Sequence, residues 1–155
     1  LESVQMFGDT GEVTEGELTL PLGVAEVKRE GTDVTIVSFG KIIKEAHDAA
    51  ETLEKDGISC EIIVLMTVRP MDHETILKSV KQTNRLVILE EAWPFGNVAT
   101  EITYQVQSQA FDFLDAPIEK INTADTPAAY SPVLLEEWLP NREDVIRAVR
   151  KVLYK

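Results

Sequence analysis

Runs of β-branched and aliphatic residues alternate along this chain with segments of helical spacing, and this alternation most constrains the fold. Four runs read as buried strands because they show little apolar/polar alternation: Val34 to Phe39, Ile58 to Leu65, Arg85 to Glu90 and Ile118 to Asn122. The segments between them are long enough for helices of about a dozen residues. Strand–helix repetition of this kind implies right-handed crossovers and a mainly parallel sheet.

The helical segments carry recognisable starts and stops. Apolar residues from Ile42 to Leu53 recur with helical spacing, and Gly57 is placed to end that helix. Asp72 is expected to cap a second helix, and Asn141, with Asp144 three residues later, a last one. Two more helical stretches are expected. One begins at Val98, and a short one framed by prolines runs from Val133 to Trp138.

The start of the chain lacks this regularity. Residues 1–20 alternate glycines with acids and threonines, so we expect an incoming arm, followed by one domain over residues 21–155. A short extended run at Val24 to Val27 leads into a turn at Glu30 to Asp33, which predicts a hairpin with the strand that follows. This extra strand makes the expected sheet mixed and five-stranded. The chain begins at Leu1 without an initiator Met, which we interpret as a fragment or a processed product.

The charge and composition of the chain restrict the kinds of partner that it is expected to bind. The 155 residues include 15 Lys and Arg against 27 Asp and Glu, a net charge of -12 that disfavours nucleic acids and anionic membranes. No apolar run approaches the roughly 18–20 residues of a membrane-spanning helix. Lys120 is the one basic residue between Leu86 and Asn141, among nine acids. This stretch provides either solubility or a docking surface for a basic protein partner.

No reaction centre is expected from the residue types and their spacing. His47, His73 and Cys60 are scattered without metal-ligand spacing, and Cys60 lies inside a predicted strand. Glu90 and Glu91 are adjacent on a strand, so their side chains are expected on opposite faces rather than at one substrate. We therefore predict no catalytic, cofactor-binding or metal-binding residue in this chain.

Two turns that follow predicted strands are candidates for an interface. Pro70 and Asp72 explain most of the turn after the second predicted strand, but local structure does not explain Arg69. We expect Arg69 to form either a local salt bridge or a contact with a neighbouring subunit or domain. Trp93 and Phe95 flank Pro94 after the next strand, where they fill either a subunit contact or the core. We select Arg69, Trp93 and Phe95 as subunit-interface residues.

Ordered motifs along almost the whole chain resemble one family. They are Leu20 to Gly23, Gly31 to Ser38, Thr67 to Asp72, Glu91 to Gly96, Phe113 to Pro117, and Ala124 to Pro127 ahead of Tyr130. Together they resemble the C-terminal domain of pyruvate dehydrogenase beta subunits, within the transketolase C-terminal-domain family. The Trp-Pro-Phe stretch and Tyr130 resemble the pyruvate enzymes more than the branched-chain ones. Branched-chain 2-oxo acid and acetoin dehydrogenase beta subunits remain alternatives, as does a free-standing acidic interaction module.

The resemblance implies an α/β three-layer sandwich, a mixed, mainly parallel five-stranded sheet with helices on both faces. It implies an assembly and docking domain of a thiamine-diphosphate-dependent decarboxylase whose cofactor and magnesium are bound outside this chain. The implied partners are the N-terminal domain of the same subunit, the alpha subunit, a second beta subunit and the peripheral subunit-binding domain of the acyltransferase core. Asp115 and the C-terminal residue Lys155 correspond to the acidic docking region for that small basic domain. The implied location is the bacterial cytoplasm, or the mitochondrial matrix in a eukaryote.

Overall fold

A single five-stranded sheet organises the chain in this computed structural model, which describes residues 10–12, 15–17 and 19–155. The strand order is β1-β3-β2-β4-β5. The pairs β3–β2, β2–β4 and β4–β5 are parallel, whereas β1 is antiparallel to β3. The strands are β1 (Glu26–Arg29), β2 (Val34–Ser38), β3 (Cys60–Val64), β4 (Leu86–Leu89) and β5 (Glu119–Ile121). The mixed, mainly parallel sheet expected from the sequence is confirmed.

The expected hairpin between the first two strands is wrong. Glu26 and Val27 of β1 pair with Val64 and Ile63 of β3, and β2 lies on the other side of β3. Gly31 passes so close to β3 that a Cβ atom on it would lie 2.2 Å from the carbonyl carbon of Cys60. The connection therefore crosses the amino end of β3 instead of turning back beside β2, and only glycine fits that crossing.

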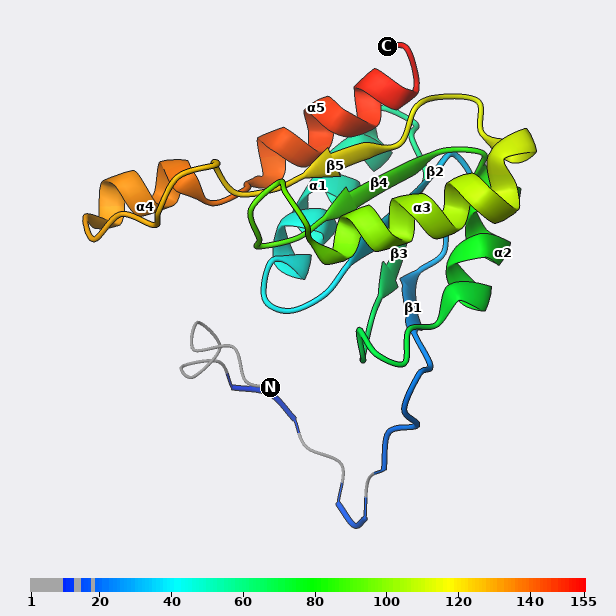
Figure 1. Ribbon diagram of the computed structural model, residues 1–155, viewed down its shortest axis with the longest axis horizontal. Coiled ribbons are helices and arrows are strands. Elements are labelled where there is room, and N and C mark those ends of the chain that lie inside the picture. The colour runs from blue at the N-terminus through cyan, green and yellow to red at the C-terminus, as the bar shows by residue number, and fades with distance from the viewer. Residues whose placement is uncertain (1–9, 13–14, 18) are drawn as a thin grey trace.

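Helices cover both faces of the sheet and complete three layers (Figure 1). One face is covered by α1 (Ile43–Lys55) and α5 (Arg142–Val152), the other by α2 (His73–Thr83) and α3 (Val98–Ala110). A short 3-10 turn, η2 (Phe111–Phe113), follows α3, and α4 (Pro132–Trp138) lies between β5 and α5. The predicted α/β sandwich with helices on both faces is confirmed.

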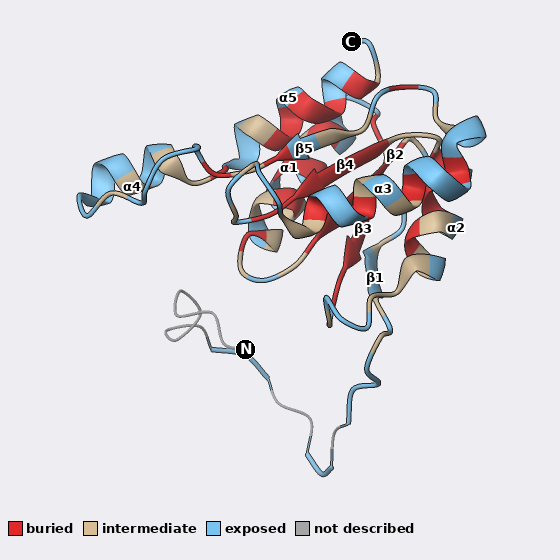
Figure 2. Cartoon of the chain, viewed as in Figure 1, coloured by how far each residue is buried: buried red, intermediate tan, exposed pale blue. Residues whose placement is uncertain are grey.

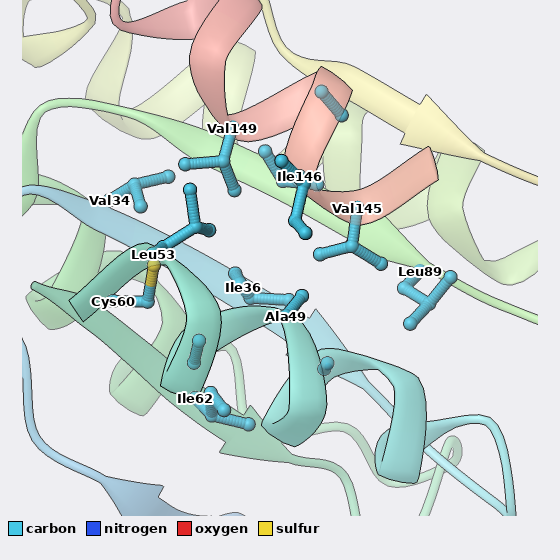
Figure 3. Close-up of a cluster of buried hydrophobic side chains, with 14 of the residues drawn as sticks. Val34, Ile36, Ala49, Leu53, Cys60, Ile62, Leu89, Val145, Ile146 and Val149 are labelled. Carbon is cyan, nitrogen blue, oxygen red and sulfur yellow. The ribbon is translucent and has the colours of Figure 1, made fainter. Parts of the chain in front are cut away.

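Each face of the sheet has its own hydrophobic core. Figure 3 shows the first, in which Leu53 of α1 and Val149 of α5 pack with strand residues such as Ile36. On the other face, Val37 and Ile63 pack with helix residues of α2 and α3, including Ile76 and Ile102. Burying each such aliphatic side chain contributes roughly 1.5–3 kcal/mol, so the two cores dominate the stability.

Side-chain caps fix where three of the helices begin. Asp72 accepts a hydrogen bond from the Thr75 amide (3.0 Å), and Asn97 accepts one from the Thr100 amide (2.9 Å). Asn141 and Asp144 form a reciprocal capping box at α5. The caps expected at Asp72 and Asn141 are confirmed.

The segment around α4 projects away from the sheet and is largely exposed (Figure 2). None of the α4 residues is buried, and Tyr130, Val133 and Leu134 are exposed. A seven-residue helix is too short to be stable by its own hydrogen bonds. Contacts with residues outside the helix therefore have to stabilise it.

The expected arm at residues 1–20 lies partly outside the described residues. Its described positions, 10–12, 15–17, 19 and 20, are exposed and carry no helix or strand. Over the described part of the chain, no helix combines the length and the apolar character that crossing a membrane requires.

Candidate functional site

The loops that follow β2, β3 and β4 form a cleft at the carboxyl ends of these strands. This edge cleft has a volume of about 590 Å³, and its walls are mainly apolar. Its lining includes Phe39, Arg69, Met71, Glu90, Trp93 and Phe95. The carboxyl edge is where ligands and partners are expected in an open parallel sheet. The three residues selected from the sequence as an interface thus share one surface.

The loop from Met66 to Asp72 is held by hydrogen bonds to the chain entering the domain. The Thr67 hydroxyl donates to the Pro70 carbonyl (2.6 Å) and accepts from the Gly23 amide (2.9 Å). Asp72 also accepts from the Ala25 amide (2.8 Å). These bonds fix the turn that presents Arg69, whose peptide bond to Pro70 is cis. Arg69 is exposed and forms no ion pair with any described residue, which leaves its guanidinium group available to a partner.

Asp72 is ionised by its surroundings. Partial burial acts to raise the pKa of its carboxyl group, but hydrogen bonds from Ala25 and Thr75 outweigh burial and hold the pKa below its ordinary value. The charged carboxylate therefore both caps α2 and anchors the incoming chain.

Trp93 and Phe95 lie in the loop between β4 and α3, and both are accessible. Trp93 is 54 % exposed and Phe95 is 91 % exposed, so neither fills the core of this chain. The loop is held from both ends, because the Asn97 side-chain Nδ2 donates to the Trp93 carbonyl (2.6 Å) and Lys120 donates to the Pro94 carbonyl (3.2 Å). A rigid loop that presents exposed aromatic side chains is typical of a protein–protein contact.

Two tryptophans connect this loop to the α4 segment. The indole N–H groups of Trp93 (3.1 Å) and Trp138 (2.8 Å) both donate to the Thr126 carbonyl. The sequence gives no signal for this arrangement, since the three residues are far apart and follow no common pattern. The shared acceptor connects the base of the projecting segment to the edge cleft.

Glu90 and Glu91 have different environments, as expected. Glu90 is fully buried and accepts hydrogen bonds from Asn122 (2.9 Å) and from the Ala99 amide at the start of α3 (3.3 Å). Burial raises the pKa of Glu90, and the bonds from Asn122 and Ala99 oppose that rise. Glu91 is more exposed, but partial burial still raises the pKa of its carboxyl group, and the positive charge of Lys41 opposes that rise. Glu90 thus supports the amino end of α3 from below the cleft.

Asp115 and Lys155 lie at the opposite, amino-terminal edge of the sheet. The Asp115 amide donates to the Asn84 carbonyl (2.9 Å) just before β4, and the Tyr154 hydroxyl donates to the Asp115 carbonyl (3.2 Å). The end of α5 is therefore next to Asp115, as the resemblance implies. The Asp115 carboxylate pairs with Arg85 of the same chain (3.3 Å).

The remaining candidates from the sequence do not form a reactive or metal-binding site. Cys60 is buried, and burial raises the pKa of its thiol to about 12, so the reactive thiolate is not formed at neutral pH. Among the described residues, no three His, Cys, Asp or Glu side chains form a group that could hold a metal ion.

Sequence reasoning missed one acid, Glu61. It is buried in β3, in a strand that otherwise reads as apolar. The signal was present, because an acid inside a strand covered on both faces breaks the expected pattern.

The model of the transketolase C-terminal domain family matches residues 23–145. The chain belongs to this family. A split-gene transketolase solved as an inactive beta4 tetramer has the same fold, with a TM-score of 0.80 and 28 % identity. The alignment covers 93 % of this chain and 46 % of that one.

Two curated relatives place the chain more narrowly within the family. It is 46 % identical over 154 residues to the pyruvate dehydrogenase E1 component subunit beta of Rickettsia felis, covering 99 % of this chain and 47 % of the relative. It is 42 % identical over 152 residues to the beta subunit of the acetoin:2,6-dichlorophenolindophenol oxidoreductase of Cupriavidus necator, covering 98 % and 45 %. The chain therefore spans about half the length of the curated relatives it matches.

Proposed function

We propose that the chain is the C-terminal assembly and docking domain of a pyruvate dehydrogenase beta subunit. The similarity to the Rickettsia felis beta subunit over 99 % of the chain carries this proposal. In the complete enzyme, thiamine diphosphate and magnesium supply the chemistry that decarboxylates pyruvate and acetylates a lipoyl group. This chain contributes protein contacts, and its own surface is built for contacts rather than for a reaction.

The edge cleft is the proposed contact with the rest of the enzyme. Trp93 and Phe95 expose aromatic surface on a loop fixed by hydrogen bonds, and Arg69 presents a guanidinium group beside them. A second beta subunit, or the preceding domain of the same subunit, buries this surface. The alpha subunit completes the proposed heterotetramer, with thiamine diphosphate and magnesium outside this chain.

The amino edge is the proposed docking site for the acyltransferase core. The small peripheral subunit-binding domain is basic, and Asp115 with the C-terminal carboxylate of Lys155 offers it negative charge. The positive Lys155 side chain and the competing Arg85 weaken this attraction, so Asp115 has to exchange partners on docking.

The proposed division places an arm at residues 1–20 and the domain at residues 21–155. The family match beginning at residue 23 supports it, as does the hydrogen bond from the Gly23 amide to Thr67. The proposed location is the bacterial cytoplasm, or the mitochondrial matrix of a eukaryote.

The test compares the chain alone with the completed enzyme. The 155-residue chain is assayed with thiamine diphosphate, magnesium, pyruvate and an artificial electron acceptor, and we expect no turnover. The same assay follows coexpression of the longer reading frame with an alpha subunit, when pyruvate should be consumed. Turnover by the chain alone would contradict its role as a non-catalytic domain.

An acetoin-oxidising enzyme is the second candidate, because the 42 % identity to the Cupriavidus necator subunit supports it as well. Activity of the completed enzyme with acetoin and not with pyruvate would favour it. A reading frame that starts at Leu1, with no upstream thiamine-enzyme domain, would favour a free-standing acidic module instead.

A further inference from the structure

Glu61 occupies a place in the sheet where an apolar side chain is expected. It lies in β3, whose residues are all buried, and it is only 7 % exposed. Its side chain is on the same face as Ile63, which belongs to the core beneath α2 and α3. Its carboxylate oxygens are not fully enclosed, so a charged group that pairs with Glu61 can reach them from outside the domain.

No described residue supplies that group. The Glu61 carboxylate forms no hydrogen bond or ion pair within the described part of the chain. The neighbouring Thr35 hydroxyl is already bonded to Ser79 (2.6 Å) and Thr83 (2.7 Å). The positively charged side chains of β1 form salt bridges with other acids: Lys28 pairs with Glu26 (2.7 Å), and Arg29 pairs with Glu54 (3.1 Å).

Glu61 faces a pocket at the amino edge of the sheet, between β1, β3 and α2. This Glu61 pocket has a volume of about 530 Å³ and is lined by residues that include Glu30, Thr32, Ser59, Glu61, Lys78 and Ser79. Its volume lies within the range of roughly 300–1,000 Å³ typical of small-ligand sites. The tight passage of Gly31 over Cys60 fixes one wall, since any side chain at Gly31 would collide with the β3 backbone.

We propose that the Glu61 pocket binds a small organic cation with a primary ammonium or guanidinium group. Its N–H groups would donate to the Glu61 carboxylate, while Glu30 adds negative charge and the hydroxyl oxygens of Thr32 and Ser59 accept further bonds. A cation of this kind pairs with the Glu61 carboxylate, which an anionic or neutral ligand does not. The inference rests on the pocket alone and is independent of the enzyme in which the chain works.

Two sources can supply such a cation, a free amine or a Lys or Arg side chain of another protein. The first 27 residues of this chain contain neither Lys nor Arg, so the incoming arm does not supply it. Lys78 of this chain can compete with such a cation for Glu61, because its exposed side chain lies at the rim of the pocket and is also positively charged.

The test uses calorimetric titration of the folded 155-residue chain at low salt with agmatine, which carries both cationic groups. We expect saturable binding that weakens at least about tenfold in Glu61→Gln, the cost of one charge-assisted contact. Glu51→Gln, which removes an exposed acid of α1 outside the pocket, should leave the affinity unchanged. The neutral guanidine analogue N-butylurea should not bind. Absence of agmatine binding at tens of millimolar, or equal binding by Glu61→Gln, would overturn the proposal.

A second pair of measurements separates a ligand site from an internal ion pair with Lys78. If Glu61 serves a ligand, Glu61→Gln should melt at the same or a higher temperature than the wild type without ligand, because the substitution breaks no ion pair within the chain. Lys78→Gln should then bind agmatine at least as tightly as the wild type. Equal destabilisation by both variants, with no agmatine binding by either, would show an internal pair and overturn the proposal.

A blocked Gly-Arg-Gly peptide distinguishes the two sources. Binding of agmatine without binding of the peptide assigns the site to a free amine, whereas equal or tighter binding of the peptide assigns it to a protein side chain. Should Glu61→Gln fail to fold, Glu30→Gln at the rim replaces it, with a loss of affinity expected and an unchanged affinity counting against the proposal.

Discussion

The two edges of the sheet present different chemistry to solvent. At the carboxyl edge, the loop after β4 exposes Trp93 and Phe95 beside the apolar edge cleft. At the amino edge, the connections present charge and hydroxyl groups, with Asp115 beside the end of α5 and Glu61 in a pocket that charged and hydroxyl side chains help to line. Both edges rest on the same buried strands. The comparison teaches that one sheet can carry apolar surface at one edge and charged surface at the other.

The strongest test of this division is Asp115→Ala, at the amino edge. Loss of its carboxylate should weaken docking of a basic acyltransferase domain by about 2–5 kcal/mol if the contact is desolvated in the complex. Surface plasmon resonance on the assembled enzyme would measure this, with Asp112→Ala, another exposed acid of the same stretch, as the control. Because Asp115 pairs with Arg85 at a half-exposed site, the stability of the free chain should change little. Unchanged docking affinity at low and high salt would remove Asp115 from the site.

Gly31→Ala tests whether the amino edge depends on the tight crossing over β3. The added Cβ would meet the Cys60 backbone at 2.2 Å, so strands have to move apart, and we expect a loss of about 3 kcal/mol in unfolding free energy. Urea denaturation measures it. Gly11→Ala, where a Cβ meets nothing within 4 Å, should be neutral. A fully stable Gly31→Ala chain would show that the crossing is wider than this.

Phe95→Ala tests the apolar character of the carboxyl edge. A central aromatic contact contributes about 2 kcal/mol or more to association, so assembly of the complete enzyme should weaken by at least about thirtyfold. Sedimentation equilibrium measures the change, and Phe111→Ala, an exposed aromatic residue of η2, is the matched control. Equal effects from both variants would indicate general loss of apolar surface rather than a specific edge cleft.

Asp72→Ala tests how the carboxyl edge is held. It removes the cap of α2 and the bond from Ala25, so we expect a loss of about 1–2 kcal/mol at neutral pH. Since the folded-state pKa of Asp72 lies below its unfolded value, its contribution is present above that unfolded pKa and is lost as the pH falls through the folded pKa. Urea denaturation curves of the two proteins should therefore begin to converge as the pH falls below about 4. A difference that stays constant in acid would rule out an ionised cap.

Glu90→Gln should have the smallest effect and the opposite pH dependence. Burial raises the folded-state pKa of Glu90, so its contribution to stability falls as the pH rises from the ordinary carboxyl pKa through the raised value. The unfolding free energy of the variant minus that of the wild type should therefore increase with pH across this window. A difference that decreases with pH would show that the bonds from Asn122 and Ala99 stabilise the charged form more than burial opposes it.

The sequence by itself determined the class of fold and most of the helix ends. Buried strands and amphipathic helices are local patterns, and caps such as Asp72 and Asn141 act within four residues of their own position. Trp93 and Phe95 could also be selected as candidate interface residues, because they stand out beside Pro94 after a strand. Their convergence with Arg69 followed from the rule that parallel strands end at a common edge.

Only the tertiary structure decided which strand β1 joins, which acids are paired and where the pockets lie. The pairing of β1 with β3 depends on the close passage of Gly31 over Cys60, a contact between residues 29 positions apart. The isolation of Glu61 depends on neighbours that bond one another instead, Thr35 to Ser79 and Thr83. Such outcomes depend on which groups, far apart in the sequence, come close enough to pack or to form hydrogen bonds. Local sequence patterns do not encode these contacts.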